Sequence, residues 1–429
     1  MTRTVTSLSA LILSIVLLVS GNAFLMTLLG VRLSIESVSA DIIGWILVCY
    51  SIGFVLGTLY VNRIISRVGH IRTFAAFAAM AAVCALLYPM AVSEPLWALL
   101  RVLSGFSAAS VLVVIESWFS SRATNANRGT LFAVYQIVFY SSVAGGQLLI
   151  NVGEPSSFVP FSLAATLLTV ALIPLALTRM EAPAVEAIER LSFLTLARES
   201  FTGVSGALVC GALIGSFYAL GPVYASLAGL EVSGISRFMA SAIIAAMILA
   251  WPMGRLCDLF DRRRVMFWAA LMAAIAAVLV VFFGAGKLWL LTLLAGLFTG
   301  LSAALYPISV AITNDRMASN RIVAASGTLL LSYGIGSVIG PIVMAQLVAM
   351  LGPNGLFMGS AGFLVLLAAA TRYRIASTAD IPVADQQHFI PAMPESSTAL
   401  VEIDPRNEEF HEVNEETLPP HEPEPGRSH

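Results

Sequence analysis

The chain has 429 residues, of which 58% are hydrophobic and only 11% carry a charge. Soluble domains average about 45–50% apolar and about 25% charged residues, so this composition excludes a single water-soluble core. The formal net charge of −2 says little by itself, and we expect no nucleic acid as a partner. We therefore expect the lipid bilayer to be the solvent of this chain.

Twelve apolar runs are long enough to cross a bilayer, which takes roughly 20 residues of α-helix. The first run is too long for a signal peptide, and no small-residue cleavage site follows it, so we interpret it as a span. The sequence thus predicts an all-α integral membrane protein with twelve transmembrane helices. The runs lie near 8–30, 42–62, 71–91, 96–119, 130–152, 158–178, 203–228, 236–256, 265–284, 288–311, 323–350 and 355–373.

Basic residues gather on one side of this predicted topology. Of the 23 arginines and lysines, 19 fall in the first residues, in alternate loops and in the C-terminal tail. The other four are Arg32, Arg101, Arg237 and Lys287. Because basic loops stay in the cytoplasm, this asymmetry predicts a protein of the plasma (inner) membrane with both termini inside.

The spans divide into two halves around residues 179–202, which we predict to be a cytoplasmic linker. Residues 1–178 then form an N-terminal six-helix bundle, and residues 203–375 form a C-terminal one. The halves share weak similarity at an offset of about 192–193 residues; for example, Tyr140 aligns with Tyr333. Such repeats are typical of transporters whose halves rock against each other. The linker stretch "EAIERLSFLTLARES" has the apolar spacing of a short helix on the membrane surface.

The last residues, 376–429, have a different composition from the rest of the chain. They contain twelve acids and few large apolar side chains. Since such a segment cannot repay the entropy of folding, we predict a disordered, acidic, cytoplasmic tail. A tail that binds a partner is the alternative interpretation.

Two charged loops, after spans 2 and 8, carry the clearest motif. The second reads "GRLCDLFDRRR", and Gly254, Asp258, Arg262 and Arg263 match the pattern G-x-x-x-D-R-x-G-R-R of the major facilitator superfamily. Span 4 begins with "RVLSGFSAA", which is similar to that family's R-x-x-x-G-x-x-A-A pattern. The chain resembles this superfamily over residues 1 to about 373. The stretches "WPMGRL", "VVIESW" and "LLLSYGIGSVIGP" resemble its YcaD-type branch.

The resemblance implies a secondary transporter, and no enzyme. We expect a monomer that moves an unidentified small solute by alternating access, with a proton as the coupling ion. The family's cavity is lined by spans 1, 4, 7 and 10. An uncoupled facilitator and a ligand sensor that transports nothing remain the alternatives. No nucleotide-binding loop, H-E-x-x-H motif or paired cysteines occur in the sequence, so we expect no cofactor and no metal.

The resemblance also implies a cytoplasmic latch between the halves. Asp258 should lie near the start of span 5, where Arg128 and the helix N-terminus would attract it. Arg262 or Arg263 should face Asp315. The loop after span 2 has Ser66 in place of the aspartate, which makes the predicted latch one-sided. The predicted latch residues are Arg67, Arg72, Arg128, Gly254, Asp258, Arg262, Arg263 and Asp315.

Two ionisable residues in span 4 are candidates for coupling or for the cavity. An ionisable group inside a span normally faces a cavity or a partner. Glu116 either takes part in proton or substrate chemistry or pairs locally with Arg67. Arg101 either acts as a cation of the cavity, as the family motif implies, or extends to the membrane interface.

Several neutral or terminal polar residues could line the cavity, although packing within the bundle would explain each of them equally well. These candidates are Asn22, Arg32, Gln136, Tyr218, Tyr224 and Tyr306. Gly336 and Gly340, four residues apart in span 11, instead predict a close approach of two helices.

Overall fold

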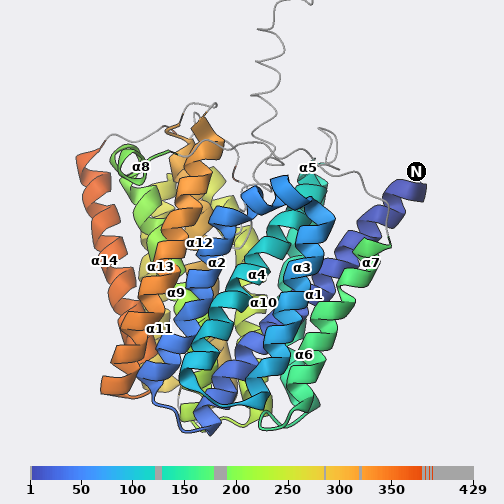
Figure 1. The fold of residues 1–429 in the computed structure, drawn as a ribbon. Helices are drawn as coiled ribbons and strands as arrows, with labels where there is room; N and C mark the ends of the chain where they lie inside the picture. Colours follow the sequence, from blue (N-terminus) through green and yellow to red (C-terminus); the bar gives the residue numbers. More distant parts are fainter. Residues whose placement is uncertain are drawn as a thin grey trace, which may run out of the picture.

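The computed structural model describes residues 2–120, 128–177, 191–284, 287–317 and 321–378, together with Pro382, Gln386 and Phe389. Within these residues every regular element is a helix (Figure 1). Twelve segments are long and apolar enough to cross a membrane, which confirms the predicted fold class and number of spans.

The first half contains α1 to α7 and two 3₁₀ turns. Its sixth span is interrupted after Val170, so it consists of two consecutive helices. The elements are α1 (Thr2–Ile35), α2 (Ala40–Val68), α3 (His70–Leu87), η1 (Tyr88–Met90), α4 (Glu94–Ser120), α5 (Arg128–Leu148), η2 (Leu149–Val152), α6 (Val159–Val170) and α7 (Leu172–Ala176).

The second half begins after a short helix in the linker. Its elements are α8 (Phe193–Glu199), α9 (Phe201–Leu227), α10 (Val232–Leu259), α11 (Arg262–Phe283), α12 (Leu288–Asn314), α13 (Ile322–Leu351) and α14 (Gly355–Ser377). Several helices extend past the predicted apolar runs; α2, predicted to end at residue 62, continues to Val68. Backbone hydrogen bonding continues past the apolar core, so hydropathy underestimates helix length.

The two halves repeat the same packing. In the first half α1 packs on α5 and α6, α2 and α3 pack on α4, and α3 packs on α6. In the second half α9 packs on α13 and α14, α10 and α11 pack on α12, and α11 packs on α14. The weak sequence repeat therefore corresponds to a structural repeat.

The start of α1, the start of α5 and helix α8 lie at one end of the bundle (Figure 1). We call it the basic end, because Arg67, Arg72 and the arginines at the start of α11 lie there. Helix α8 packs there through the buried side chain of Leu196. It matches the short helix predicted in the linker, while residues 178–190 lie outside the described part.

Glycines allow the closest helix pairs. A Cβ atom at Gly105 of α4 would overlap the carbonyl oxygen of Tyr50 of α2. On α13, a Cβ at Gly336 would overlap the carbonyl oxygen of Leu208, and one at Gly340 would overlap the backbone of Ala212. The close approach predicted for Gly336 and Gly340 is thus confirmed, with α9 as the partner.

The tail shows a partial departure from the predicted disorder. Helix α14 continues to Ser377, two residues into the segment 376–429. Phe389 packs against α10, and its backbone N–H donates a hydrogen bond to Asp258 Oδ1 at 2.8 Å. Low overall hydropathy does not prevent one aromatic side chain from binding to the bundle. The tail beyond Phe389 lies outside the described residues.

Candidate functional site

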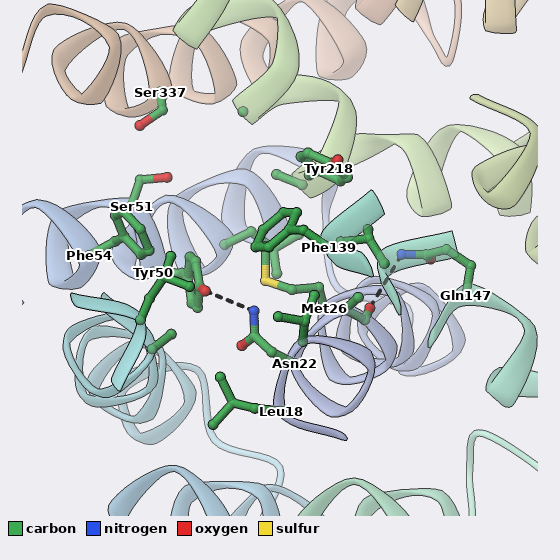
Figure 2. Close-up of a pocket in the computed structure, with 18 of the residues that line it drawn as sticks. Leu18, Asn22, Met26, Tyr50, Ser51, Phe54, Phe139, Gln147, Tyr218 and Ser337 are labelled. Carbon is green, nitrogen blue, oxygen red and sulfur yellow. Dashed lines mark hydrogen bonds between the residues drawn. The ribbon is translucent and has the colours of Figure 1, made fainter. Parts of the chain in front are cut away.

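A cavity of about 150 Å³ lies between the two halves, near the middle of the bundle (Figure 2). Its wall comes from α1, α2, α4 and α5 of the first half and from α9 and α13 of the second. The polar side chains in this wall are Asn22, Tyr50, Ser51, Gln147, Tyr218, Tyr333 and Ser337. No lining residue in the described part of the chain carries a formal charge.

Helical periodicity determines which side chains of α1 face the cavity. Leu18, Asn22 and Met26 are four residues apart, so they share one face of α1 and point into the cavity (Figure 2). The Asn22 amide donates a hydrogen bond to the Tyr50 hydroxyl on α2 at 2.9 Å. This bond joins two helices across the wall and fixes both polar groups at the cavity surface.

Gln147 supplies the polar group on the α5 side. Its side-chain oxygen accepts a hydrogen bond from the Thr27 hydroxyl, and its amide nitrogen donates to the Ala23 carbonyl at 3.5 Å. Both partners lie on α1 and Thr27 is buried, so the amide is held in one orientation. A bound solute would meet a preorganised polar group at this position.

Two of the predicted lining residues, Asn22 and Tyr218, lie in the wall. Tyr306 lies one layer behind, with its ring packed edge-on against Tyr333 at 5.6 Å between centroids. Gln136 is half-buried on α5 and is not among the lining residues. Sequence spacing alone cannot determine which face of a span meets the cavity.

Arg32 and Tyr224, two further predicted lining residues, are not among the residues that line this cavity. Arg32 pairs with Glu36 at 2.5 Å and donates to the carbonyl of Pro155 at 3.3 Å, which fixes the end of α1. Tyr224 packs edge-on against Phe357 at 4.8 Å within the second half. Both residues serve packing within one half.

Arg101 is buried inside the first half, with 1% of its surface exposed. The alternative that it extends to the membrane interface is therefore wrong. Its Nη2 lies 3.0 Å from Met26 Sδ and 3.4 Å from the Leu47 carbonyl oxygen. Its guanidinium carbon lies 4.6 Å from the centre of the Tyr50 ring. All three partners line the cavity, so Arg101 sits directly behind the wall.

Glu116 is fully buried near the other end of α4. The Tyr135 hydroxyl of α5 donates a hydrogen bond to its carboxylate. Arg67, the alternative local partner of Glu116, is exposed at the end of α2, and a pair between them stays a prediction. Glu116 lies outside the cavity wall, which separates any proton chemistry at this group from direct contact with solute.

Spans 2, 5 and 11 contribute much of the wall. The family's spans 1, 4, 7 and 10 do not include them, and among the three only span 5 held a predicted lining candidate. Helix α12, the tenth span, supplies none of the described lining residues. Tyr50 and Ser51 on α2, and Tyr333 and Ser337 on α13, take that place. Their signal in the sequence was a polar residue within an otherwise apolar run, which packing within a bundle explains equally well.

The halves touch at the end of the bundle opposite the basic end. The Ser236 hydroxyl of α10 donates to the Gln147 carbonyl of α5 at 2.9 Å and accepts from the Asn151 amide at 3.0 Å. A Cβ at Gly30 of α1 would lie 3.3 Å from Pro222 of α9. We call these contacts the α5–α10 seal and the α1–α9 seal. They close the cavity toward that end.

At the basic end, the predicted contact between α11 and Asp315 is present. Arg262 Nη1 lies 2.5 Å from Asp315 Oδ1, and both side chains are buried. Arg262 also donates to the carbonyl of Ala311 at 3.2 Å. This pair joins α11 to the end of α12 within the second half.

The neighbouring residues have separate roles. Asp261 caps α11 by accepting hydrogen bonds from the backbone N–H groups of Arg263 and Arg264, at 2.8 and 3.0 Å. Arg263 donates to the Thr378 carbonyl at 3.3 Å after α14. Burial lowers the pKa of the adjacent Arg316, and the nearby positive charge of Arg263 lowers it further.

The other predicted latch residues whose side chains the structure describes do not join this cluster. Arg67 and Arg72 are exposed, and the side chain of Arg128 lies outside the described part. Asp258 accepts its hydrogen bond from Phe389, and the ring of Phe389 packs on Gly254. The predicted contact of Asp258 with the start of α5 stays a prediction about another state of the protein.

The sequence profile described as Major Facilitator Superfamily matches residues 5–251 and 236–392. The chain is 29% identical over 364 residues to an uncharacterized MFS-type transporter YcaD of Escherichia fergusonii, covering 83% of this chain and 93% of that protein. It is 32% identical over 366 residues to the YcaD protein of Escherichia coli O7:K1, with the same coverage.

Solved structures of low sequence identity share the fold. The nucleoside transporter NupG superposes with a TM-score of 0.73 at 16% identity, covering 86% of this chain and 99% of NupG. A bacterial homolog of the human lysosomal transporter Spinster, inward-facing and occupied, superposes with a TM-score of 0.69 at 15% identity, covering 89% and 98%. With its repeated six-span halves and central cavity, the chain belongs to the major facilitator superfamily of membrane transporters.

Proposed function

We propose that this protein carries a small solute across the membrane by alternating access. The observation that supports the proposal is the central cavity, whose wall combines residues from both halves. Rocking one half against the other would open the α1–α9 and α5–α10 seals. The cavity would then be exposed at the end of the bundle opposite the basic end. We further propose that the basic end faces the cytoplasm of an inner membrane, because basic loops are retained there.

Cysteine labelling tests alternating access without knowledge of the solute. Ser51→Cys places a thiol in the cavity wall, in a background where Cys49, Cys84, Cys210 and Cys257 are replaced by alanine. We expect an impermeant maleimide to label it from both sides of the membrane. The matched control is Val92→Cys, exposed beside η1, which should react only from the side opposite the basic end. Labelling of Ser51→Cys from one side alone would favour the ligand sensor.

We propose a proton as the coupling ion, with Glu116 as its carrier. Glu116 is fully buried in α4, and its hydrogen bond to Tyr135 can form with either protonation state of the carboxyl group. Loss or gain of its charge inside the bundle would change the contact that α4 makes with α5 through Tyr135, which would link protonation to conformation.

Glu116→Gln tests this coupling, because glutamine keeps the shape of the glutamate side chain but cannot bind or release a proton. In the parent protein we expect the ratio of Ser51→Cys labelling from the two sides to change between pH 5 and pH 8. In Glu116→Gln the ratio should be independent of pH. Tyr135→Phe is the control, because it removes the hydrogen bond and keeps the acid. A pH response that survives Glu116→Gln would assign coupling to another group or support the uncoupled facilitator.

A further inference from the structure

A buried positive charge lies one side chain behind an uncharged cavity. Arg101 contacts Met26, Leu47 and Tyr50, and each of these also lines the cavity. The contacts are a thioether sulfur, a carbonyl oxygen at 3.4 Å, the face of an aromatic ring and, on the side away from the cavity, the neutral phenol of Tyr88. The guanidinium thus has close neighbours but none with a negative charge.

No described carboxylate pairs with Arg101, and its Nε has no hydrogen-bond partner. A buried cation without a counter-ion is strongly destabilising, because the desolvation of the charge is not offset by Coulombic attraction. Intramembrane charges of this kind occur where a ligand or a moving group completes the site.

We propose that the cavity takes a small amphipathic monoanion, a carboxylate with an apolar body, and that Arg101 binds its charge. This inference rests on the proposed function and names its substrate class. The wall is mostly apolar and would cover the body of such a solute. Its volume of about 150 Å³ is below the roughly 300–1,000 Å³ of drug-sized sites, so the solute is small.

Met26 provides the route from the cavity to the cation. Its unbranched thioether adopts several rotamers at little cost, and Nη2 of Arg101 lies against the sulfur. When Met26 turns aside, that N–H group faces the cavity beside the Tyr50 hydroxyl and the Asn22 amide. A carboxylate there would accept from the guanidinium and from these two neutral groups.

Thermal unfolding of the purified full-length protein tests the inference with matched isosteres. The probes are benzoate with benzamide, and hexanoate with hexanamide. A compound that binds the folded state raises the apparent Tm. We expect both carboxylates to raise the Tm and both amides to leave it unchanged. Equal shifts from carboxylates and amides, or no shift from either carboxylate, would overturn the proposal.

Variants of Arg101 separate a binding role from a structural one. Without its counter-ion the charge destabilises the free protein, so Arg101→Gln should keep or raise the Tm and lose the response to carboxylates. A lower Tm with an intact response would show that Arg101 only supports packing. If Arg101→Gln does not fold, Arg101→Lys provides the test of the binding role, because lysine keeps the positive charge and lacks the planar guanidinium. We expect its response to benzoate to fall about tenfold in apparent affinity, or roughly 1.4 kcal/mol. Full wild-type affinity in Arg101→Lys would count against the proposal.

The two proposals can fail separately. Carboxylate binding without two-sided labelling of Ser51→Cys would leave the anion site standing and remove alternating access. Two-sided labelling with equal responses to carboxylates and amides would do the reverse.

A second and independent observation concerns the tail. The backbone N–H of Phe389 bonds to Asp258, and a Cβ at Gly254 would lie only 2.8 Å from the Phe389 ring. Because glycine has no Cβ atom, Gly254 leaves the space that this ring occupies. Gly254 and Asp258 are motif residues near the basic end of α10, the helix that meets α5 in the seal at the other end.

We infer that this tail contact holds the basic ends of α5 and α10 apart. Rocking that breaks the α5–α10 seal would bring those ends together, and on the α10 side Phe389 already occupies Gly254 and Asp258. Release of the ring would then be a step in closing the basic end, and the tail would act as an intramolecular brake.

Distances between spin labels at Ile71→Cys on α3 and Leu259→Cys on α10, both exposed at the basic end, test the brake. We expect Phe389→Ala, or removal of residues 379–429, to increase the population with the shorter distance about tenfold, a change of roughly 1.4 kcal/mol. The control is Phe410→Ala, at the other phenylalanine of the tail, which should leave the distances unchanged. Unchanged distances in Phe389→Ala and in the truncated protein would overturn the inference, and they do so whatever the solute is.

Discussion

Arg262 and Asp315 form a buried ion pair that joins the start of α11 to the end of α12. Removing one partner leaves the other charge buried and uncompensated, which typically costs about 3–5 kcal/mol. We predict that Asp315→Ala lowers the free energy of unfolding by this amount, measured by denaturant unfolding in detergent.

The exposed pair of Arg321 and Glu199, 3.3 Å apart, provides the control. Water already solvates both groups, so Glu199→Ala should cost about 0–1 kcal/mol. Equal losses in the two variants would mean that the Arg262–Asp315 pair is not desolvated as the structure indicates.

Pairs of helices approach closely where a glycine faces a backbone carbonyl. Gly105 of α4 meets the Tyr50 carbonyl of α2 in this way, so Gly105→Ala forces the two helices apart. We predict a destabilisation of about 1–3 kcal/mol, the usual range for overpacking, and a lower Tm. Because Tyr50 lines the cavity and stacks on Arg101, the same change should also weaken ligand binding.

Gly362 of α14 is the matched position, since a Cβ there would meet nothing within 4 Å. Gly362→Ala should leave the Tm unchanged or raise it slightly, because alanine favours a helix more than glycine does. A tolerated Gly105→Ala would contradict the close approach of α2 and α4.

For the whole molecule, we expect the α5–α10 seal to set the balance between the two open states of the proposed alternating access. Ser236 makes two hydrogen bonds across the halves, each worth about 0.5–1.5 kcal/mol. We predict that Ser236→Ala shifts the equilibrium by about 1–3 kcal/mol toward the state open at the seal. Labelling of Ser51→Cys from that side should then increase about 5- to 150-fold.

Ser233→Ala, one turn earlier on α10 and exposed, changes the same residue type away from the seal. In this variant the labelling of Ser51→Cys should equal that in the parent protein. An increase in both variants would indicate a general loosening of α10, whereas an increase in neither would remove the seal from the mechanism.

Composition and periodicity predicted what lipid enforces. Twelve apolar runs became twelve spanning helices, because an unsatisfied backbone group inside a bilayer costs too much for any other open structure. The contact of Arg262 with Asp315 was also predictable, since the motif fixes which charges lie at the basic end. Likewise Gly336 and Gly340 predicted a close helix pair, because only glycine permits such an approach.

The cavity itself required the tertiary structure. Every span here is apolar on most faces, so hydropathy does not indicate which face meets solute and which meets lipid. Arg32 and Tyr224 were equally plausible as lining residues, yet helix rotation directs both into packing within one half. The positions of Tyr50 beside the Asn22 amide, of Arg101 behind Tyr50, and of Phe389 on Gly254 depend on contacts between residues far apart in sequence. The sequence by itself determined the membrane fold, its repeat and its charge asymmetry, since these follow from local composition in lipid. Packing of the helices alone decided which polar groups meet in the cavity.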